Sequence, residues 1–346
     1  MQTTSRIAWV DSMKAFSIMA VVLYHTNIMS EIRTAAYLVC LPAFFFVAGI
    51  FTNTSLSPLV FFKKKTIRLL TPYILFGLLS WLAWLLIGRK YGSDTDDAVT
   101  WWYPLWGQLC GKTQPMVHNR PIWFLACMIS LEWVYYLISR IQRKWFRWLC
   151  IAGIAICGCV LAYSDRILVW ELTSVMFILP LYAASGEGRT RILQLAGVVE
   201  NKLPLLFAIL VVSLIGVGVG FVYNPHINIS MAEIGNPILF YLTVVSVVGL
   251  LFSLSLLIDK FFGSVRWLSY IGRNTLVLLC LHIPAFGAIK GACLLCGVPL
   301  TFYGTNAGSL FLWVATFAVL LPVAGLINRY FPFLLNIYRR PLMHNQ

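Results

Sequence analysis

The chain has 346 residues, of which 60% are hydrophobic and 11% charged, and its mean hydropathy is +0.82. Soluble domains are nearer half apolar and a quarter charged, so this composition excludes a soluble protein and indicates a polytopic membrane protein. The formal net charge of +14 follows from the distribution of basic residues between the apolar segments, and it does not indicate nucleic-acid binding.

The first apolar segment, about 9–29, carries three ionisable residues, Asp11, Lys14 and His25. A charge at bilayer depth costs about 2.5 to 3.5 kcal/mol on insertion scales, so such residues usually face a bundle interior or a water-filled cavity. On a helix the three lie within roughly 60° of one another, and Lys14 and His25 are about 16 Å apart along the axis. This arrangement suits an elongated ligand that is charged at one end and reactive at the other.

Further apolar windows long enough to cross a bilayer follow near 35–53, 68–88, 121–139, 146–164, 167–184, 203–223, 235–258, 267–287 and 307–327. With a cytoplasmic N-terminus, the basic residues gather in the connections on the N-terminal side, chiefly 63–68, 140–147, 189–202, 260–266 and 329–340. The positive-inside rule therefore predicts an all-α bundle of about ten transmembrane helices with both termini cytoplasmic. Residues 1–346 form one integral membrane domain, and 89–120 form an extracytoplasmic aromatic loop within it.

The nine cysteines lie mostly in apolar runs and are an odd number, so we interpret them as small core residues. Cys293 and Cys296 have the spacing of a redox or metal pair, but no second pair or nearby histidine accompanies them. We therefore expect no metal.

Four segments carry further patterns: Phe45–Gly49, Lys65–Pro72, Trp123–Leu125 and Asn274–His282. Together with Lys14 and His25, which are separated by ten residues, these segments in this order resemble the acyltransferase 3 family of integral membrane O-acyltransferases. The resemblance spans nearly the whole chain and is strongest to the branch similar to fucose 4-O-acetylases. Three positions depart from the family pattern: Lys14 and Lys65 stand where many members have arginine, which has a bidentate fork that lysine lacks, and Ala48 replaces a frequent serine.

The resemblance implies transfer of an acyl group, usually acetyl from acetyl-CoA, to a hydroxyl of a cell-envelope or lipid-linked sugar. It implies a multi-pass protein of the bacterial inner membrane whose partners are acyl-CoA, a sugar or glycan acceptor and the bilayer.

For catalysis we expect His25, toward the extracytoplasmic side, to act as general base, because imidazole titrates near operating pH. An acyl-histidine intermediate is the variant mechanism, and a packing histidine is the structural alternative. Asp11 is too far along the helix to orient His25. We therefore predict Glu132, about 13 Å into its helix from Trp123, as the partner of His25, with a purely structural hydrogen bond as the alternative.

For acyl-CoA binding we predict Lys14, Asp11, Lys65 and Arg68; the first two lie toward the cytoplasmic end of the first helix. Lys14, Lys65 and Arg68 would attract phosphate, and Asp11 would pair with Lys14 or Arg68 and hold that side chain in position. The alternatives are an intramembrane ion pair and ordinary positive-inside placement.

For the acceptor we predict Asn119, Trp123, His282 and Asn274, with helix packing as the alternative for the last two. The loop aromatics Trp101, Trp102, Tyr103 and Trp106, beside His118 and the acidic cluster Asp94, Asp96 and Asp97, form either a sugar platform or an interfacial aromatic belt.

Two other functions fit ten helices with buried charges. One is a transporter or exporter of glycan or lipid-linked intermediates, although no paired Gly/Pro interruption relates the two halves of the chain. The other is a non-catalytic scaffold, against which His25, Lys14 and Arg68 argue.

Overall fold

The computed structural model describes residues 7–91 and 99–335, and this part of the chain is helical apart from loops and one isolated bridge between Asn228 and Glu233. In it, nine helical segments are long and apolar enough to cross a membrane. The 17-residue α1 (Ala8–Tyr24) is at the lower end of the spanning length and brings the total to ten. The predicted all-α polytopic bundle is confirmed. The acidic cluster Asp94, Asp96 and Asp97 lies outside the described residues.

The remaining helices are α2 (Ser30–Cys40), α3 (Pro42–Ile50), α4 (Pro58–Ala83), α5 (Arg89–Tyr91), α6 (Tyr103–Cys110), α7 (Trp123–Ser139), α8 (Lys144–Tyr163), α9 (Leu172–Glu187), α10 (Arg189–Glu200), α11 (Leu203–Tyr223), α12 (Pro237–Phe262), α13 (Arg266–Arg273), α14 (Thr275–Leu295) and α15 (Asn306–Tyr330). A π-helical stretch, Trp84–Gly88, continues α4, and short 3-10 turns, Arg120–Ile122 and Val169–Glu171, precede α7 and α9.

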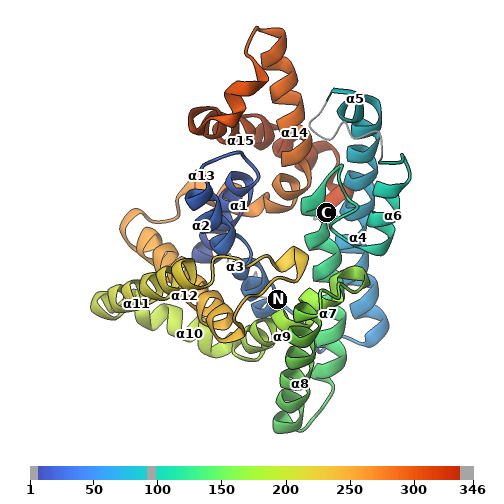
Figure 1. The fold of residues 1–346 in the computed structure, drawn as a ribbon. Coiled ribbons are helices and arrows are strands. Elements are labelled where there is room, and N and C mark those ends of the chain that lie inside the picture. Colours follow the sequence, from blue (N-terminus) through green and yellow to red (C-terminus); the bar gives the residue numbers. More distant parts are fainter. Residues whose placement is uncertain (1–6, 92–98, 336–346) are drawn as a thin grey trace, which may run out of the picture.

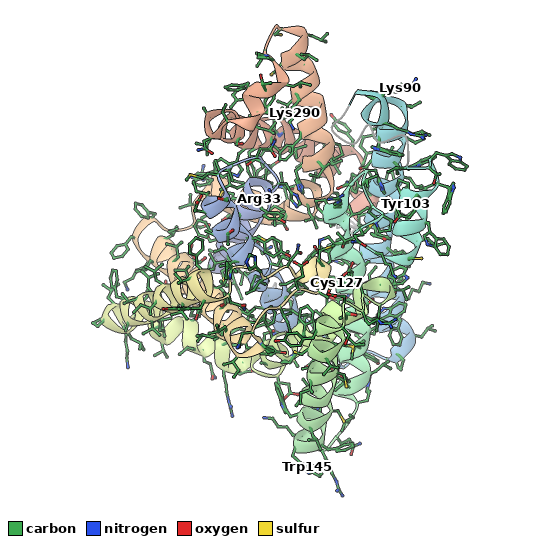
Figure 2. All side chains as sticks on the ribbon, in the orientation of Figure 1. Arg33, Lys90, Tyr103, Cys127, Trp145 and Lys290 are labelled. Carbon is green, nitrogen blue, oxygen red and sulfur yellow. The ribbon has the colours of Figure 1, made fainter. Side chains whose placement is uncertain are left out.

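The first helix is the centre of the arrangement. It packs against α2, α3, α12, α13, α14 and α15, and Figure 1 shows α1 to α3 surrounded by α10 to α12, by α4 with α7 to α9, and by α13 to α15. Trp145, in the basic stretch 140–147 where α8 begins, lies at the far end of the molecule from Lys90 and Lys290 (Figure 2). Because α1 packs against six other helices, its buried ionisable groups can meet side chains from several of them.

Three predicted windows differ from the observed helices. The second is divided at Pro42, where a new helix begins because proline lacks the N–H that would continue the first. The third begins at Pro58, so the basic run 63–68 lies inside α4 and not in a connection. The ninth is divided at Asn274 into α13 and α14.

Gly272 allows α13 to touch α1. A Cβ at this position would clash with the backbone carbonyl of Asp11. The close approach places the start of α14 beside the acidic end of α1.

Candidate active site

A cavity of about 580 Å³ opens between α1, α3, α4, α7, α10 and α14. Its ionisable lining residues are Asp11, Lys14, Lys65, Arg68, Glu132 and Arg189. Phe44, Ala48, Phe124, Leu125 and Met128 supply much of the apolar wall. The structure thus brings the four predicted donor-binding residues, from α1 and α4, to one cavity that is lined in part by all four patterned segments, Phe45–Gly49, Lys65–Pro72, Trp123–Leu125 and Asn274–His282.

The two carboxylates that line this cavity are both ion-paired. On α1, Lys14 Nζ lies 2.8 Å from Asp11 Oδ1, and Arg273 Nε lies 3.7 Å from Asp11 Oδ2. Between α4 and α7, Lys65 Nζ donates to Glu132 Oε1 at 2.6 Å. Both carboxylates are buried, and burial of a charge is tolerated when the charge is paired.

The structure pairs the carboxylate of Glu132 with Lys65, and not with His25, the partner predicted from the sequence. The reason is the early start of α4, which places Lys65 inside a helix that packs along α7. The second oxygen, Oε2, is buried without a hydrogen-bond partner among the described residues and belongs to a residue that lines the cavity. It can accept a hydrogen bond from a ligand.

His25 lies at the C-terminal end of α1, away from the lining of the cavity, and is half-buried. Its ring centroid is 5.2 Å from that of His282 on α14 and 4.8 Å from that of Tyr24. His282 Nδ1 lies 2.9 Å from the carbonyl oxygen of Leu278. A carbonyl only accepts, so Nδ1 carries the proton and Nε2 keeps its lone pair.

The tautomer of His282 matters because its Nε2 is buried and has no hydrogen-bond partner in the described part of the chain. The two imidazoles form a pair that is contributed by helices far apart in the sequence. Their positions make His282 a neighbour of His25, although the sequence associated His282 with the acceptor.

Asn119 lies next to the His282 segment. It is fully buried, and its Nδ2 donates to Ser80 Oγ at 2.9 Å and to the carbonyl oxygen of Cys280 at 2.8 Å. Its Oδ1 has no partner in the described structure. Trp123 is buried at the start of α7.

Asn274 does not join His282. Its Nδ2 donates to the carbonyl oxygen of Tyr270 at 2.8 Å, and its Oδ1 accepts from Asn328 Nδ2 at 2.6 Å. It lies at the cavity end of α14, beside Thr275. Its amide groups are used in packing helices, which was the structural alternative for this residue.

The aromatic loop is divided between surface and interior. Trp101, Trp102, Tyr103 and Trp106 are exposed, which fits either a sugar platform or a membrane-interface belt. His118, in the connection before α7, is buried and neither ring nitrogen has a partner among the described residues. Burial lowers the pKa of His118 to about 4.

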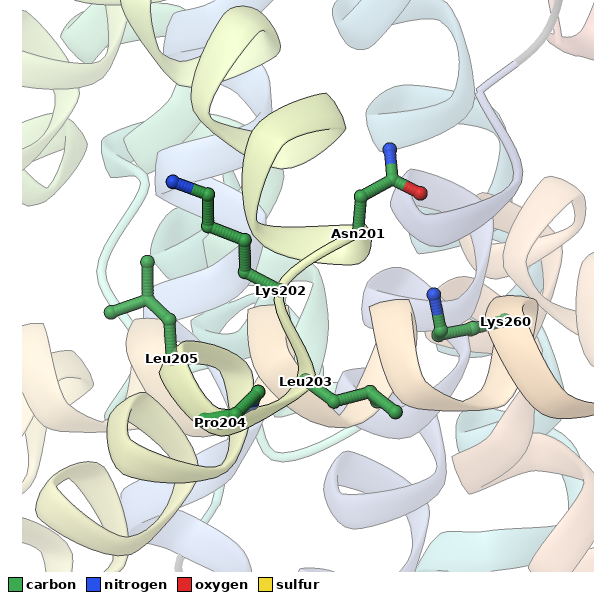
Figure 3. A pocket seen from close by; sticks show the side chains of 6 residues that line it. All are labelled: Asn201, Lys202, Leu203, Pro204, Leu205 and Lys260. Carbon is green, nitrogen blue, oxygen red and sulfur yellow. The ribbon is translucent and has the colours of Figure 1, made fainter.

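Arg189 and Thr275, which are not among the site residues predicted from the sequence, also line the cavity. In the sequence Arg189 is one basic residue among several in a predicted cytoplasmic connection. A separate open hollow between the α10–α11 connection and α12 is lined by Asn201, Lys202, Leu203, Pro204, Leu205 and Lys260 (Figure 3). It presents lysines and apolar side chains without a carboxylate or histidine.

No group of three histidine, cysteine or acidic side chains is arranged to hold a metal ion within residues 7–91 and 99–335. All nine cysteines are free thiols. The ionisable groups that the structure gathers are the imidazoles of His25 and His282 and the ion-paired side chains of the cavity.

Comparison with known proteins gives one finding. Searches of curated proteins and of solved structures return no match. A comparison with protein families matches residues 7–337, nearly the whole chain, to the acyltransferase 3 family, described as an acyltransferase domain. On that match, and with a polytopic helical fold that fits it, the chain belongs to the acyltransferase 3 family of membrane acyltransferases.

Proposed function

We propose that this membrane acyltransferase is an O-acetyltransferase that transfers acetyl from acetyl-CoA to a hydroxyl of a cell-envelope or lipid-linked sugar. The observation that carries the proposal is the cavity, in which cationic side chains and an apolar wall meet at the end of α1 opposite to His25. An acyl-CoA has this same polarity, with phosphates at one end and a thioester at the other.

In the proposed reaction, the imidazole of His25 removes the proton from the acceptor hydroxyl while the oxygen attacks the thioester carbonyl. The tetrahedral intermediate collapses with cleavage of the C–S bond. The thiolate of CoA takes the proton from the imidazolium of His25, so the products are the sugar ester and free CoA. In the variant mechanism His25 itself is acylated first and the sugar oxygen then displaces it.

Three sets of residues support this chemistry. His282 offers its unprotonated Nε2 on the ring that packs beside His25, so it can stabilise the imidazolium and hold the orientation of the ring. Asn119, whose Oδ1 has no partner among the described residues, and Trp123 are the proposed acceptor-binding residues. Asp11, Lys14, Lys65 and Arg68 are the proposed donor-binding residues.

The test is transfer of label from radiolabelled acetyl-CoA into envelope glycan by membranes that carry equal amounts of protein. We expect His25→Ala to lose transfer and to remain inserted and abundant. His226→Ala, which changes an exposed histidine outside the site, is the matched control and should retain transfer. Equal labelling by all three proteins would remove His25 from catalysis, and no labelling with native acceptor and alternative acyl donors present would favour the transporter.

A further inference from the structure

The charged side chains around the cavity do not contribute equally to its net charge. Lys14 and Lys65 each lie within hydrogen-bond distance of a buried carboxylate. Arg68 and Arg189 form no salt bridge with any carboxylate of the described residues. The four cations and two carboxylates of the lining therefore leave a net charge of +2, and the two arginines carry it.

The two arginines also lie where a phosphorylated ligand would enter. Arg68 and Arg189 are exposed, whereas Lys14 and Lys65 are only partly so, with side-chain exposures of 23% and 12%. Arg68 projects from α4 and Arg189 begins α10. The guanidinium of Arg189 is held over the ring of Phe51, 5.9 Å from its centroid, and Phe51 also lines the cavity.

A third contribution comes from the backbone. Thr275 and Leu276, the first residues of α14, line the same cavity. The side chain of Asn274 does not cap this helix, since its Oδ1 accepts from Asn328. The uncapped N–H groups and the helix dipole therefore add positive potential to a cavity that already has a net positive charge.

From these observations we propose that Arg189 is a donor-binding residue that, together with Arg68, binds the phosphate groups of acyl-CoA at the mouth of the cavity. The inference rests on the proposed function and adds a residue to it. Guanidinium groups bind phosphate oxygens through two parallel N–H donors. The paired lysines still donate hydrogen bonds to the ligand, but Asp11 and Glu132 cancel their charge.

This assignment divides the cavity into two parts. The phosphates remain at the mouth, where they keep part of their hydration. The pantetheine arm lies deeper, along the apolar wall formed by Phe44, Ala48 and Phe124. There Glu132 Oε2, buried and without a partner in the described structure, accepts a hydrogen bond from an amide N–H of that arm.

The test is equilibrium binding of CoA and of dephospho-CoA to the purified full chain in lipid nanodiscs. Arg189→Gln is compared with Arg191→Gln, which removes an exposed arginine of the same helix that does not line the cavity. Loss of a charged hydrogen-bond donor weakens binding about tenfold, so we expect that change for Arg189→Gln and less than twofold for Arg191→Gln. Arg189→Lys should recover part of the affinity.

The two ligands locate the contact. Equal weakening for CoA and dephospho-CoA places Arg189 on the diphosphate, and weakening for CoA alone places it on the 3′-phosphate; both results support the assignment. If the wild type binds CoA and Arg189→Gln binds it equally well, or both glutamine variants weaken it alike, the role of Arg189 is overturned and the proposed function stands. If the wild type binds neither ligand, the acyl-CoA donor fails and the role of Arg189 fails with it.

Discussion

The pair of Lys65 and Glu132 provides a direct test of how the cavity is built. The two side chains are 12% and 6% exposed, and Nζ and Oε1 are 2.6 Å apart. Replacing Lys65 with methionine keeps much of the apolar stem and leaves the carboxylate of Glu132 buried without its cation. Breaking a buried pair in this way costs about 3 to 5 kcal/mol.

Changing both partners should cost much less. In Lys65→Met/Glu132→Gln no buried charge remains, and replacement of a whole buried pair by neutral groups is often near neutral in stability. We expect the double variant to recover about 2 kcal/mol or more of the stability that Lys65→Met loses.

The assay is thermal unfolding of the four proteins of this cycle in one detergent, with the free energy of each single and double change compared. Strict additivity of the two single changes would refute the ion pair. The same proteins separate structure from binding, because a double variant that is stable but binds CoA more weakly than the wild type would assign Lys65 or Glu132 to the donor.

Three further predictions concern other parts of the molecule. Gly272→Ala should destabilise the protein by about 1 to 3 kcal/mol through overpacking against α1, whereas Gly287→Ala, where a Cβ meets open space, should be neutral or stabilising in the same unfolding assay. His282→Ala should lower kcat by about tenfold, which is less than the 10²- to 10⁴-fold contribution of a general base. It should leave KM for acetyl-CoA unchanged and shift the acidic limb of the pH profile of kcat, and an unchanged profile would make His282 a packing residue. His118 is held neutral in the fold with its pKa lowered from 6.5 to about 4, so it costs nothing at pH 7 and destabilises the fold progressively between about pH 6.5 and 4, by on the order of 3 kcal/mol at most. The unfolding temperature of the wild type should therefore fall relative to that of His118→Asn as the pH drops from 6.5 to 4, and a difference that stays constant over this range would contradict this.

The hydrophobic segments were predictable because bilayer thickness fixes the length of an apolar helix. The sequence could also place Lys14 and His25 on one face of α1, because helical periodicity alone determines it. The same reasoning could not foresee the break at Asn274, since both α13 and α14 are helical and only their packing, with Gly272 against α1, shows why the chain turns there.

The partners of the buried acids were less predictable. Glu132 was expected near His25 because each was an intramembrane ionisable residue without a known partner. The partner of a buried side chain depends on which helices are neighbours. Here α4 packs along α7, which carries Glu132, whereas α14 packs along α1. For the same reason Arg189 looked like one more cytoplasmic arginine, because nothing in its local sequence shows that α10 begins at the mouth of the cavity.

The most direct test of the proposed donor site is a structure of the protein with CoA bound. We expect density for CoA in the cavity between α1, α4 and α7, with its phosphates between Arg68 and Arg189 and its sulfur directed toward the imidazoles of His25 and His282. CoA bound outside this cavity, or bound within it with the sulfur at the arginines, would contradict the proposed donor site.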